Sequence, residues 1–225
     1  MHRRLKVGVF GVGSLGQHHA RIYAELPTAD FVGVHDLNPE RAREIADRCH
    51  TRAFADMHEL AAAVEAASVA VPTDRHHAVA MALMRRGVHL LVEKPIAATT
   101  AEAEEMVRLA DERRLILQVG HVERFNPVMR FLEEHLTAPR FIEVIRLAPY
   151  PPPREAAAPR GTEVSVVLDL MIHDLDVILH LVRSPLKEVH AIGVPVLSAT
   201  EDIANARLVF ASGCVANVTA SRISQ

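Results

Sequence analysis

Leu5-Lys6-Val7-Gly8-Val9-Phe10-Gly11-Val12-Gly13-Ser14-Leu15-Gly16 is the stretch that decides the fold. Its first half, up to Phe10, has the length and β-branched content of a buried parallel strand. The rest fits the pattern G-x-G-x-x-G, in which glycines permit a tight turn and a close approach of the backbone to a diphosphate. The residues from Gln17 to Leu26 predict a helix whose N-terminal amides face that anion. The stretch therefore predicts a dinucleotide-binding loop; the alternative is a glycine turn in an α/β domain without a cofactor.

A second predicted strand, Phe31 to His35, ends at Asp36. This acid follows the glycines by about 20 residues, the distance at which a carboxylate can hold the hydroxyls of an adenosine ribose. The same carboxylate would repel a 2′-phosphate. We therefore expect NAD as the cofactor, with NADP less favoured.

The composition limits the class of protein. The chain has 225 residues, 49% of them hydrophobic, and a net charge of −3, which suffices for a real core and argues against general nucleic-acid binding. No apolar run approaches a membrane span, and the N-terminus leads directly into the first strand, without room for a signal peptide. Cys49 and Cys214 are interpreted as free thiols of a reducing cytoplasm, with a disulfide left open. We expect a cytoplasmic protein with neither a nucleic-acid nor a membrane partner.

The rhythm of the pattern divides the chain. Strands and helices alternate from residue 5 to about 120, which is typical of a doubly wound parallel sheet that binds ligands at the carboxyl ends of its strands. After Gly120 the pattern predicts a helix over 126–136, a strand over 141–147, a helix over 163–182, and strands near 188–197, 202–210 and 214–220. Consecutive strands predict a largely antiparallel second sheet. The fold class is therefore α/β, with a cofactor domain in 1–120 and an α+β substrate and oligomerisation domain in 121–225.

Two segments of the second domain raise questions. The proline-rich stretch from Pro149 to Pro159 is either a spacer, which the sequence favours, or a mobile wall of a substrate pocket. The strand at 214–220 would leave an unpaired edge unless another segment covers it.

Lys94 is the first candidate for chemistry. It stands in Glu93-Lys94-Pro95, directly after a predicted core strand over 88–92, where this kind of sheet places its ligands. An ammonium there could bond a substrate hydroxyl and relay its proton. The alternative is a surface Glu-Lys pair.

Asp169 and His173 are the second candidates. They are four residues apart on one predicted helix and so share a face. Oxidation of a secondary alcohol needs a base for the hydroxyl proton, and an imidazole oriented by a carboxylate suits that role. The alternative is an incidental pair on a solvated helix. Asp176 and His180 extend the face, but ligands from a single helix make a metal site improbable, so no metal is expected.

Other polar residues give weaker signals. Arg124, Arg146, Arg154 and Arg160 could bind a substrate diphosphate in a bidentate manner, or could be scattered solvated arginines. Most histidines, including His18, His19, His77 and His121, are expected at the surface or at caps. His76 differs because Pro72-Thr73-x-x-His76 follows a strand at the predicted cofactor edge.

Taken in order, these motifs resemble the Gfo/Idh/MocA oxidoreductases. The resemblance rests on the glycine loop, on Val71-Pro72-Thr73-x-x-His76, on the run from Ala82 to Pro95, and on Asp169-x-x-x-His173. It implies a Rossmann domain followed by an open-sheet domain whose sheets commonly pair between subunits. It also implies that Lys94, Asp169 and His173 are catalytic and that the Lys94-Pro95 bond is cis. The implied cofactor residues are Gly11, Gly13, Ser14, Leu15, Gly16, Asp36, Pro72, Thr73, His76, Glu93 and Lys94.

A finer resemblance is to the branch of this family that oxidises the 3-hydroxyl of UDP-N-acetylglucosamine, for the amino sugar of lipid A. It rests on the segments 120–127, 167–174, 203–208 and 220–222. The substrate residues it implies are His121, Arg124, Asn126 and Arg146. Family members usually continue further, so the second domain is expected to lack its C-terminal part. The alternatives are a dehydrogenase of inositol or a free monosaccharide, and a non-catalytic sensor of cofactor or sugar.

Overall fold

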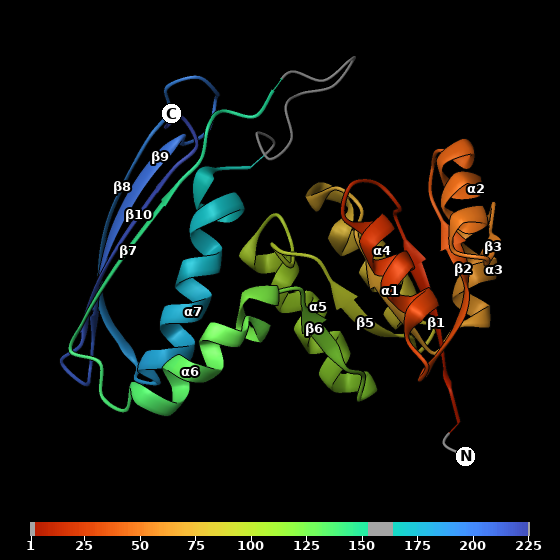
Figure 1. The fold of residues 1–225 in the computed structure, drawn as a ribbon, viewed down its shortest axis with the longest axis horizontal. Helices are drawn as coiled ribbons and strands as arrows, with labels where there is room; N and C mark the ends of the chain where they lie inside the picture. Colours follow the sequence, from red (N-terminus) through yellow and green to blue (C-terminus); the bar gives the residue numbers. More distant parts are fainter. Residues whose placement is uncertain (1–2, 153–163, 225) are drawn as a thin grey trace. The chain divides into compact units, whose positions relative to one another are not determined.

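The computed structural model describes residues 3–152 and 164–224. The chain folds into two compact units, Met1–Gly120 and His121–Gln225. Each unit has its own sheet and its own buried core (Figure 1).

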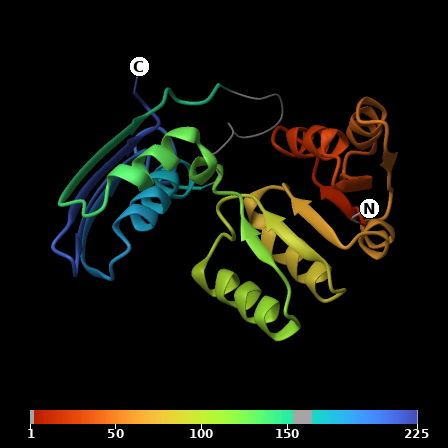
Figure 2. The same cartoon turned by 60° about the horizontal axis from the view of Figure 1, so that its bottom comes forward.

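The first unit is a sheet of parallel strands with helices on both faces (Figures 1 and 2). The strand order is β3-β2-β1-β4-β5-β6. The strands are β1 (Leu5–Phe10), β2 (Ala29–His35), β3 (Arg52–Ala53), β4 (Ala66–Val69), β5 (His89–Val92) and β6 (Leu117–Val119). The helices are α1 (Gly16–Glu25), α2 (Pro39–Arg48), α3 (Met57–Ala63), α4 (Thr73–Met84) and α5 (Thr100–Arg113). The predicted doubly wound α/β arrangement is confirmed.

Side-chain caps fix the starts of two of these helices. The Asn38 side chain accepts hydrogen bonds from the second and third amides of α2, with Pro39 in its first turn. Thr99 and Glu102 form a reciprocal capping box at the start of α5. Helix α4 begins at Thr73, and the carbonyl of Pro72 accepts from Arg75 N in its first turn.

The second unit packs a long helix against a mixed sheet. Its elements are the 3-10 turn η1 (Val122–Phe125), α6 (Pro127–His135), β7 (Phe141–Leu147), the π-helical turn η2 (Val167–Met171), α7 (Ile172–Val182), β8 (Leu186–Val194), β9 (Ile203–Phe210) and β10 (Val215–Ser221). The sheet order is β7-β10-β9-β8, and only the β7–β10 pair is parallel. On β9 and β10, alternate residues are buried against α7 and η2.

The structure answers one question about this sheet. The sequence predicts an unpaired edge at 214–220 unless another segment covers it, and the structure shows β10 paired on both sides, between β7 and β9. Val215 aligns with Phe141 of β7, more than seventy residues earlier in the chain. A pairing this distant in sequence leaves no local signal. The edges of the sheet are β7 and β8, and every residue of β8 is exposed.

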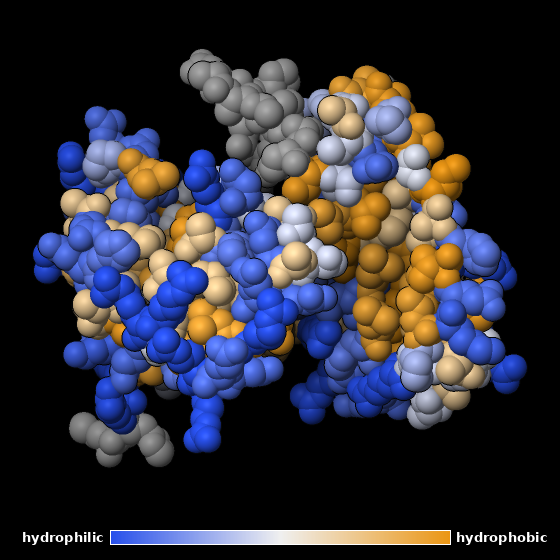
Figure 3. Space-filling view, turned by 180° about the vertical axis from the view of Figure 1, so that it is seen from behind, coloured by the Kyte–Doolittle hydropathy of each residue, from blue (hydrophilic) through white to orange (hydrophobic). Residues whose placement is uncertain are grey.

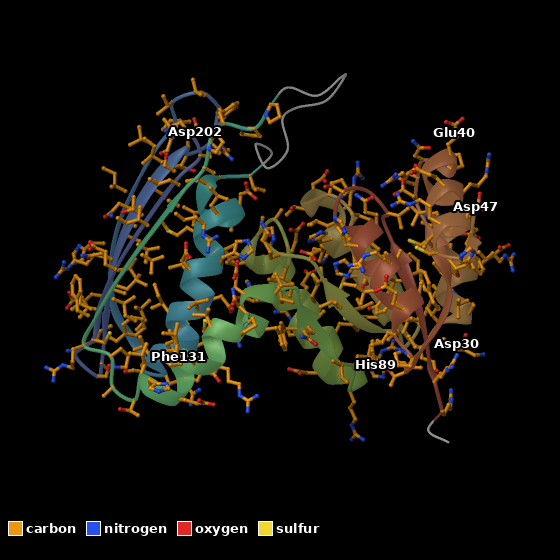
Figure 4. All side chains as sticks on the ribbon, in the orientation of Figure 1. Asp30, Glu40, Asp47, His89, Phe131 and Asp202 are labelled. Atoms are coloured by element: carbon orange, nitrogen blue, oxygen red, sulfur yellow. The ribbon has the colours of Figure 1, made fainter. Side chains whose placement is uncertain are left out.

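A buried ion pair closes one end of the second sheet. Arg222 and Asp202 are 2% and 0% exposed, and Nε of the arginine donates to Oδ1 of the carboxylate over 2.8 Å. The other carboxylate oxygen accepts from the amides of residues 196, 197 and 198. The guanidinium also donates to the Val164 carbonyl and to the Thr200 hydroxyl. Asp202 therefore ties β9 to the end of β10 and to the preceding loop (Figure 4).

Candidate active site

The glycine loop has the shape that a diphosphate requires. Gly11 has φ of +84°, and a Cβ there would lie 2.8 Å from Val71. A Cβ on Gly16 would lie 1.8 Å from the Gly11 carbonyl oxygen, so only glycine lets α1 start this close to β1. Around Gly13 nothing stands within 4 Å of an added Cβ. The backbone is therefore open to a ligand at Gly13, in the middle of the loop.

The start of α1 is suited to an anion. Leu15, at the N-cap position, makes no side-chain capping bond, and the first turn carries no acidic residue. The first amides of a helix without a side-chain cap remain available to a phosphate, which the helix dipole also favours. Ser14 is exposed beside them. The loop thus fits the diphosphate of a dinucleotide.

Asp36 stands at the end of β2 with its carboxylate fixed by the backbone. Oδ2 accepts from Val12 N and Oδ1 from Asn38 N, each over 2.8 Å. A carboxylate oxygen can accept more than one hydrogen bond, so both can still receive ribose hydroxyls. The nearby Arg41 donates to the Val12 carbonyl and pairs with Glu44, so its charge is already matched.

Lys94 lies at the same strand edge. It is the second residue after β5 and is half-buried. Its peptide bond with Pro95 is cis, as the resemblance implies. Strands β1, β4 and β5 are neighbours and parallel, so their carboxyl ends meet. The structure thereby brings together the glycine loop, the Val71–Thr73 turn and Lys94 within the first unit.

His76 does not take the position expected of a cofactor ligand. It is 1% exposed, with Nδ1 2.8 Å from the Pro95 carbonyl oxygen and Nε2 2.9 Å from that of Val71. Both ring nitrogens are used inside the protein. The imidazole joins the Val71 turn to the Lys94-Pro95 segment, and so holds the loop rather than the cofactor.

Glu93 is also occupied inside the protein. Its Oε1 lies 2.8 Å from Nε2 of His19, and its Oε2 accepts from Lys94 N over 3.3 Å. The other ring nitrogen of His19 lies 3.0 Å from Oγ of Ser68, which is 2.7 Å from the Tyr23 hydroxyl. His19 was expected at the surface or at a cap, so this network was missed. Ser68 was the available signal, because a polar residue inside an apolar strand needs a partner.

In the second unit, the predicted helix over 163–182 is not a uniform α-helix. Ile172 N donates to the carbonyl of Val167, five residues back, and closes a π-turn. Asp169 lies inside that turn and His173 in the α-helix that follows, both half-buried. A π-turn changes the number of residues per turn, so the α-helical spacing that placed both side chains on one face does not apply unchanged. Such turns are frequent at functional sites.

Arg124 and Arg146 were expected to bind a substrate diphosphate, and the structure pairs both with carboxylates. Arg124 makes two bonds to Asp176, 2.7 and 2.6 Å long, and Arg146 makes two to Asp174, 2.8 and 2.7 Å long. These hydrogen bonds raise the pKa of each guanidinium. Asp174 directly follows His173, so these arginines of η1 and β7 fix the orientation of α7, and each pair uses Nε and one terminal nitrogen of the guanidinium.

The two other expected substrate residues differ from each other. Asn126 caps α6 by accepting from Val128 N, so its side chain has a structural use. His121 has Nε2 3.9 Å from the Asp176 carboxylate, and its Nδ1 is buried with no hydrogen-bond partner among the described residues. A buried polar atom left without a bond is costly, so His121 remains a candidate for contact with a ligand. Arg154 and Arg160 lie outside the described residues, as does most of the proline-rich stretch.

Comparison with known proteins agrees with this geometry. A family described as "Oxidoreductase family, NAD-binding Rossmann fold" (GFO_IDH_MocA) matches residues 5–121, and the "GFO/IDH/MocA C-terminal domain" matches residues 133–225. The chain belongs to the Gfo/Idh/MocA family of oxidoreductases. It is accordingly a dehydrogenase that uses a nicotinamide cofactor.

Among its relatives is UDP-N-acetylglucosamine 3-dehydrogenase from Acidithiobacillus ferrooxidans, 41% identical over 97% of this chain and 67% of that protein. A solved structure of that dehydrogenase superposes with a TM-score of 0.90, covering all of this chain and 72% of the other. Myo-inositol 2-dehydrogenase from Thermotoga maritima is more distant, 26% identical over 84% of this chain and 58% of that protein.

Among residues 3–152 and 164–224, no group of three or more histidine, cysteine or acidic side chains could hold a metal ion. Over the same residues, no helix has both the length and the apolar character to cross a membrane.

Proposed function

We propose that the protein oxidises the 3-hydroxyl of UDP-N-acetylglucosamine with NAD. The observation that carries the proposal is the meeting of the open glycine loop and the cis Lys94-Pro95 segment at one strand edge. The choice of substrate follows the 41% identity to a UDP-N-acetylglucosamine 3-dehydrogenase.

Each residue has a part in this reaction. NAD, when bound, supplies the acceptor for the hydride of the alcohol carbon. Gly11, Gly13, Ser14, Leu15 and Gly16 hold the diphosphate of the cofactor through backbone amides. Pro72 and Thr73 line the same edge.

Three residues are proposed to act on the substrate hydroxyl. Lys94 and His173 share the removal of the hydroxyl proton, and Asp169 orients His173 and stabilises its charged form. Loss of the proton from the hydroxyl oxygen balances the departure of hydride from the carbon that bears this oxygen.

The test of this function is formation of NADH by the protein with UDP-N-acetylglucosamine, with N-acetylglucosamine and with myo-inositol. We expect NADH with the nucleotide sugar. The rival is oxidation of a free cyclitol. It gains from the pairing of Arg124 and Arg146 with carboxylates, since each arginine already uses two of its nitrogens in that pair. Preference for myo-inositol would establish the rival. Binding of NAD without NADH from any alcohol would point to a sensor.

The cofactor preference gives a separate prediction. We expect Asp36→Ala to weaken NAD binding about tenfold and to bring the Kd for NADP close to that for NAD. The reason is loss of two ribose hydroxyl bonds and of the charge that repels a 2′-phosphate. Titration calorimetry with each cofactor measures both constants. A wild-type protein that prefers NADP would contradict the role of Asp36.

We also propose that copies of the chain associate through the outer face of the second sheet. Register places Ile145 of β7 and Ile192 of β8 in one cross-sheet row on that face, 61% and 67% exposed. Leu147 and Val194 occupy the next row. Apolar side chains are visible over this unit in Figure 3. Exposed apolar side chains at both edges of one sheet face favour association. Sedimentation velocity should show a dimer or larger species, and a monomer at micromolar concentration would refute this part.

The expected location in the cytoplasm has one structural support. Cys49 and Cys214 are both free thiols, as a reducing compartment keeps them.

A further inference from the structure

We infer that His19 is a positioning residue for Lys94, acting through Glu93. This inference rests on the proposed function, because it concerns the lysine assigned to the substrate hydroxyl. The direct evidence is a continuous set of contacts. His19 Nε2 is 2.8 Å from Glu93 Oε1, and Glu93 Oε2 accepts from Lys94 N. Glu93 is therefore held at one oxygen by α1 and holds the lysine backbone with the other.

The hydrogen bonds of the network have one consistent direction. A carboxylate only accepts, so Nε2 of His19 carries a proton and donates to Glu93. In a neutral imidazole Nδ1 then accepts, and its donor is the hydroxyl of Ser68. The oxygen of Ser68 in turn accepts from the hydroxyl of Tyr23. Each hydrogen-bond donor along Tyr23, Ser68, His19 and Glu93 therefore meets an acceptor. The hydrogen bond from Ser68 to Nδ1 favours the His19 tautomer in which Nε2 carries the proton and donates to Glu93.

Burial makes this arrangement rigid. Ser68 is 0% exposed, Glu93 is 7% exposed, and the His19 side chain is 16% exposed. Gly120 closes the remaining side, since a Cβ there would stand 3.1 Å from Glu93 Oε1. Burial raises the pKa of Glu93, but the hydrogen bonds from His19 and from the Lys94 amide, together with the charge of Lys94, lower it more, so that the net shift is downward. The group beside Lys94 is thus an ionised carboxylate that has no room to turn.

The network also joins two parts of the cofactor site. His19 lies on α1, three residues after Gly16, and this helix begins at the loop that takes the diphosphate. Glu93 and Lys94 follow β5. A ligand that fixes the start of α1 therefore also fixes His19, and through Glu93 the backbone of Lys94.

The chain allows a sharp test of His19. The amide nitrogen of glutamine matches Nε2 of histidine in its distance from Cα, and that of asparagine matches Nδ1. His19→Gln therefore keeps the donor to Glu93, whereas His19→Asn keeps only the contact with Ser68. We expect His19→Asn to lower kcat about 50-fold, because small displacements of a catalytic group carry costs of this order. His19→Gln should recover kcat to within about fivefold, with KM and the Kd for NAD nearly unchanged in both. The exposed neighbour His18→Gln is the matched control.

A second readout does not need turnover. The ¹⁵N shifts of the His19 ring should report the neutral Nε2–H tautomer in the wild type, and the Lys94 amide resonance should move in His19→Asn but not in His19→Gln. Equal kcat for the two variants in an active protein, or an Nδ1–H tautomer, would overturn the inference. A wild type that makes no NADH defeats the proposed function alone, because the tautomer and the amide shift still decide the role of His19.

Discussion

Lys94→Ala should lower kcat for alcohol oxidation by about a thousandfold while leaving the Kd for NAD within a factor of three. Acid–base catalysis by a positioned side chain contributes about 10²- to 10⁴-fold, and Lys94 is the half-buried ammonium at the strand edge where the glycine loop opens. The diphosphate contacts come from backbone amides of another segment, so cofactor binding survives the change. Initial rates of NADH formation and titration calorimetry measure the two quantities.

Two further variants separate proton transfer from simple charge. Lys94→Arg keeps a cation but cannot exchange its proton, so we expect it to remain at least a hundredfold slower than wild type. Lys6→Ala removes an exposed lysine of the same unit and serves as the control. Activity restored by arginine would reduce Lys94 to a binding charge, and unchanged turnover in Lys94→Ala would remove it from the mechanism.

The features that sequence could predict are those with local causes. The glycine loop, the Asn38 cap and the Thr99–Glu102 capping box each need only neighbouring residues, and the structure shows each of these geometries. The position of Lys94 followed from one topological rule about parallel strands. The alternation of strands and helices predicted a parallel first sheet, because this alternation is also visible in the local sequence.

The features that sequence missed depend on partners far along the chain. The pairing of Arg124 with Asp176 was missed because the two residues are 52 positions apart. Arg124 was therefore interpreted as a candidate ligand of a diphosphate. Likewise, nothing near residue 19 indicates that His19 meets Glu93, 74 residues later. A single sequence shows that a charged or polar side chain must be satisfied, but not by which group. The π-turn at Asp169 was missed for a different reason, because spacing rules assume a regular α-helix.

Arg222→Met should cost the second unit about 3–5 kcal/mol of unfolding free energy, the usual cost of removing one partner of a buried ion pair. The change leaves the Asp202 carboxylate, 0% exposed, without its counter-charge. Denaturant unfolding followed by hydrogen exchange should show the loss in peptides of β9 and β10. Arg207→Met, which removes an exposed arginine of the same sheet, should cost less than about 0.5 kcal/mol.

The double variant Arg222→Met with Asp202→Asn tests the cause. An amide oxygen can still accept from the amides of residues 196 to 198, and it carries no charge to bury. We therefore expect it to regain part of the stability lost in the single variant. No recovery would mean that the loss came from packing of the arginine stem rather than from an unpaired charge.

The ionisation of Asp202 also predicts how the effect of Arg222→Met depends on pH. Burial raises the pKa of Asp202, but the bonds from Arg222 and from the amides of residues 196 to 198 lower it more, well below its usual range. A carboxyl group whose folded pKa is depressed stabilises the fold above its unfolded pKa, and this contribution is lost as the pH falls through and below that value. The difference in unfolding free energy between wild type and Arg222→Met should accordingly be largest near neutral pH and shrink in acid. A difference that stays constant from pH 7 down to about pH 3 would exclude ionised Asp202 as its source.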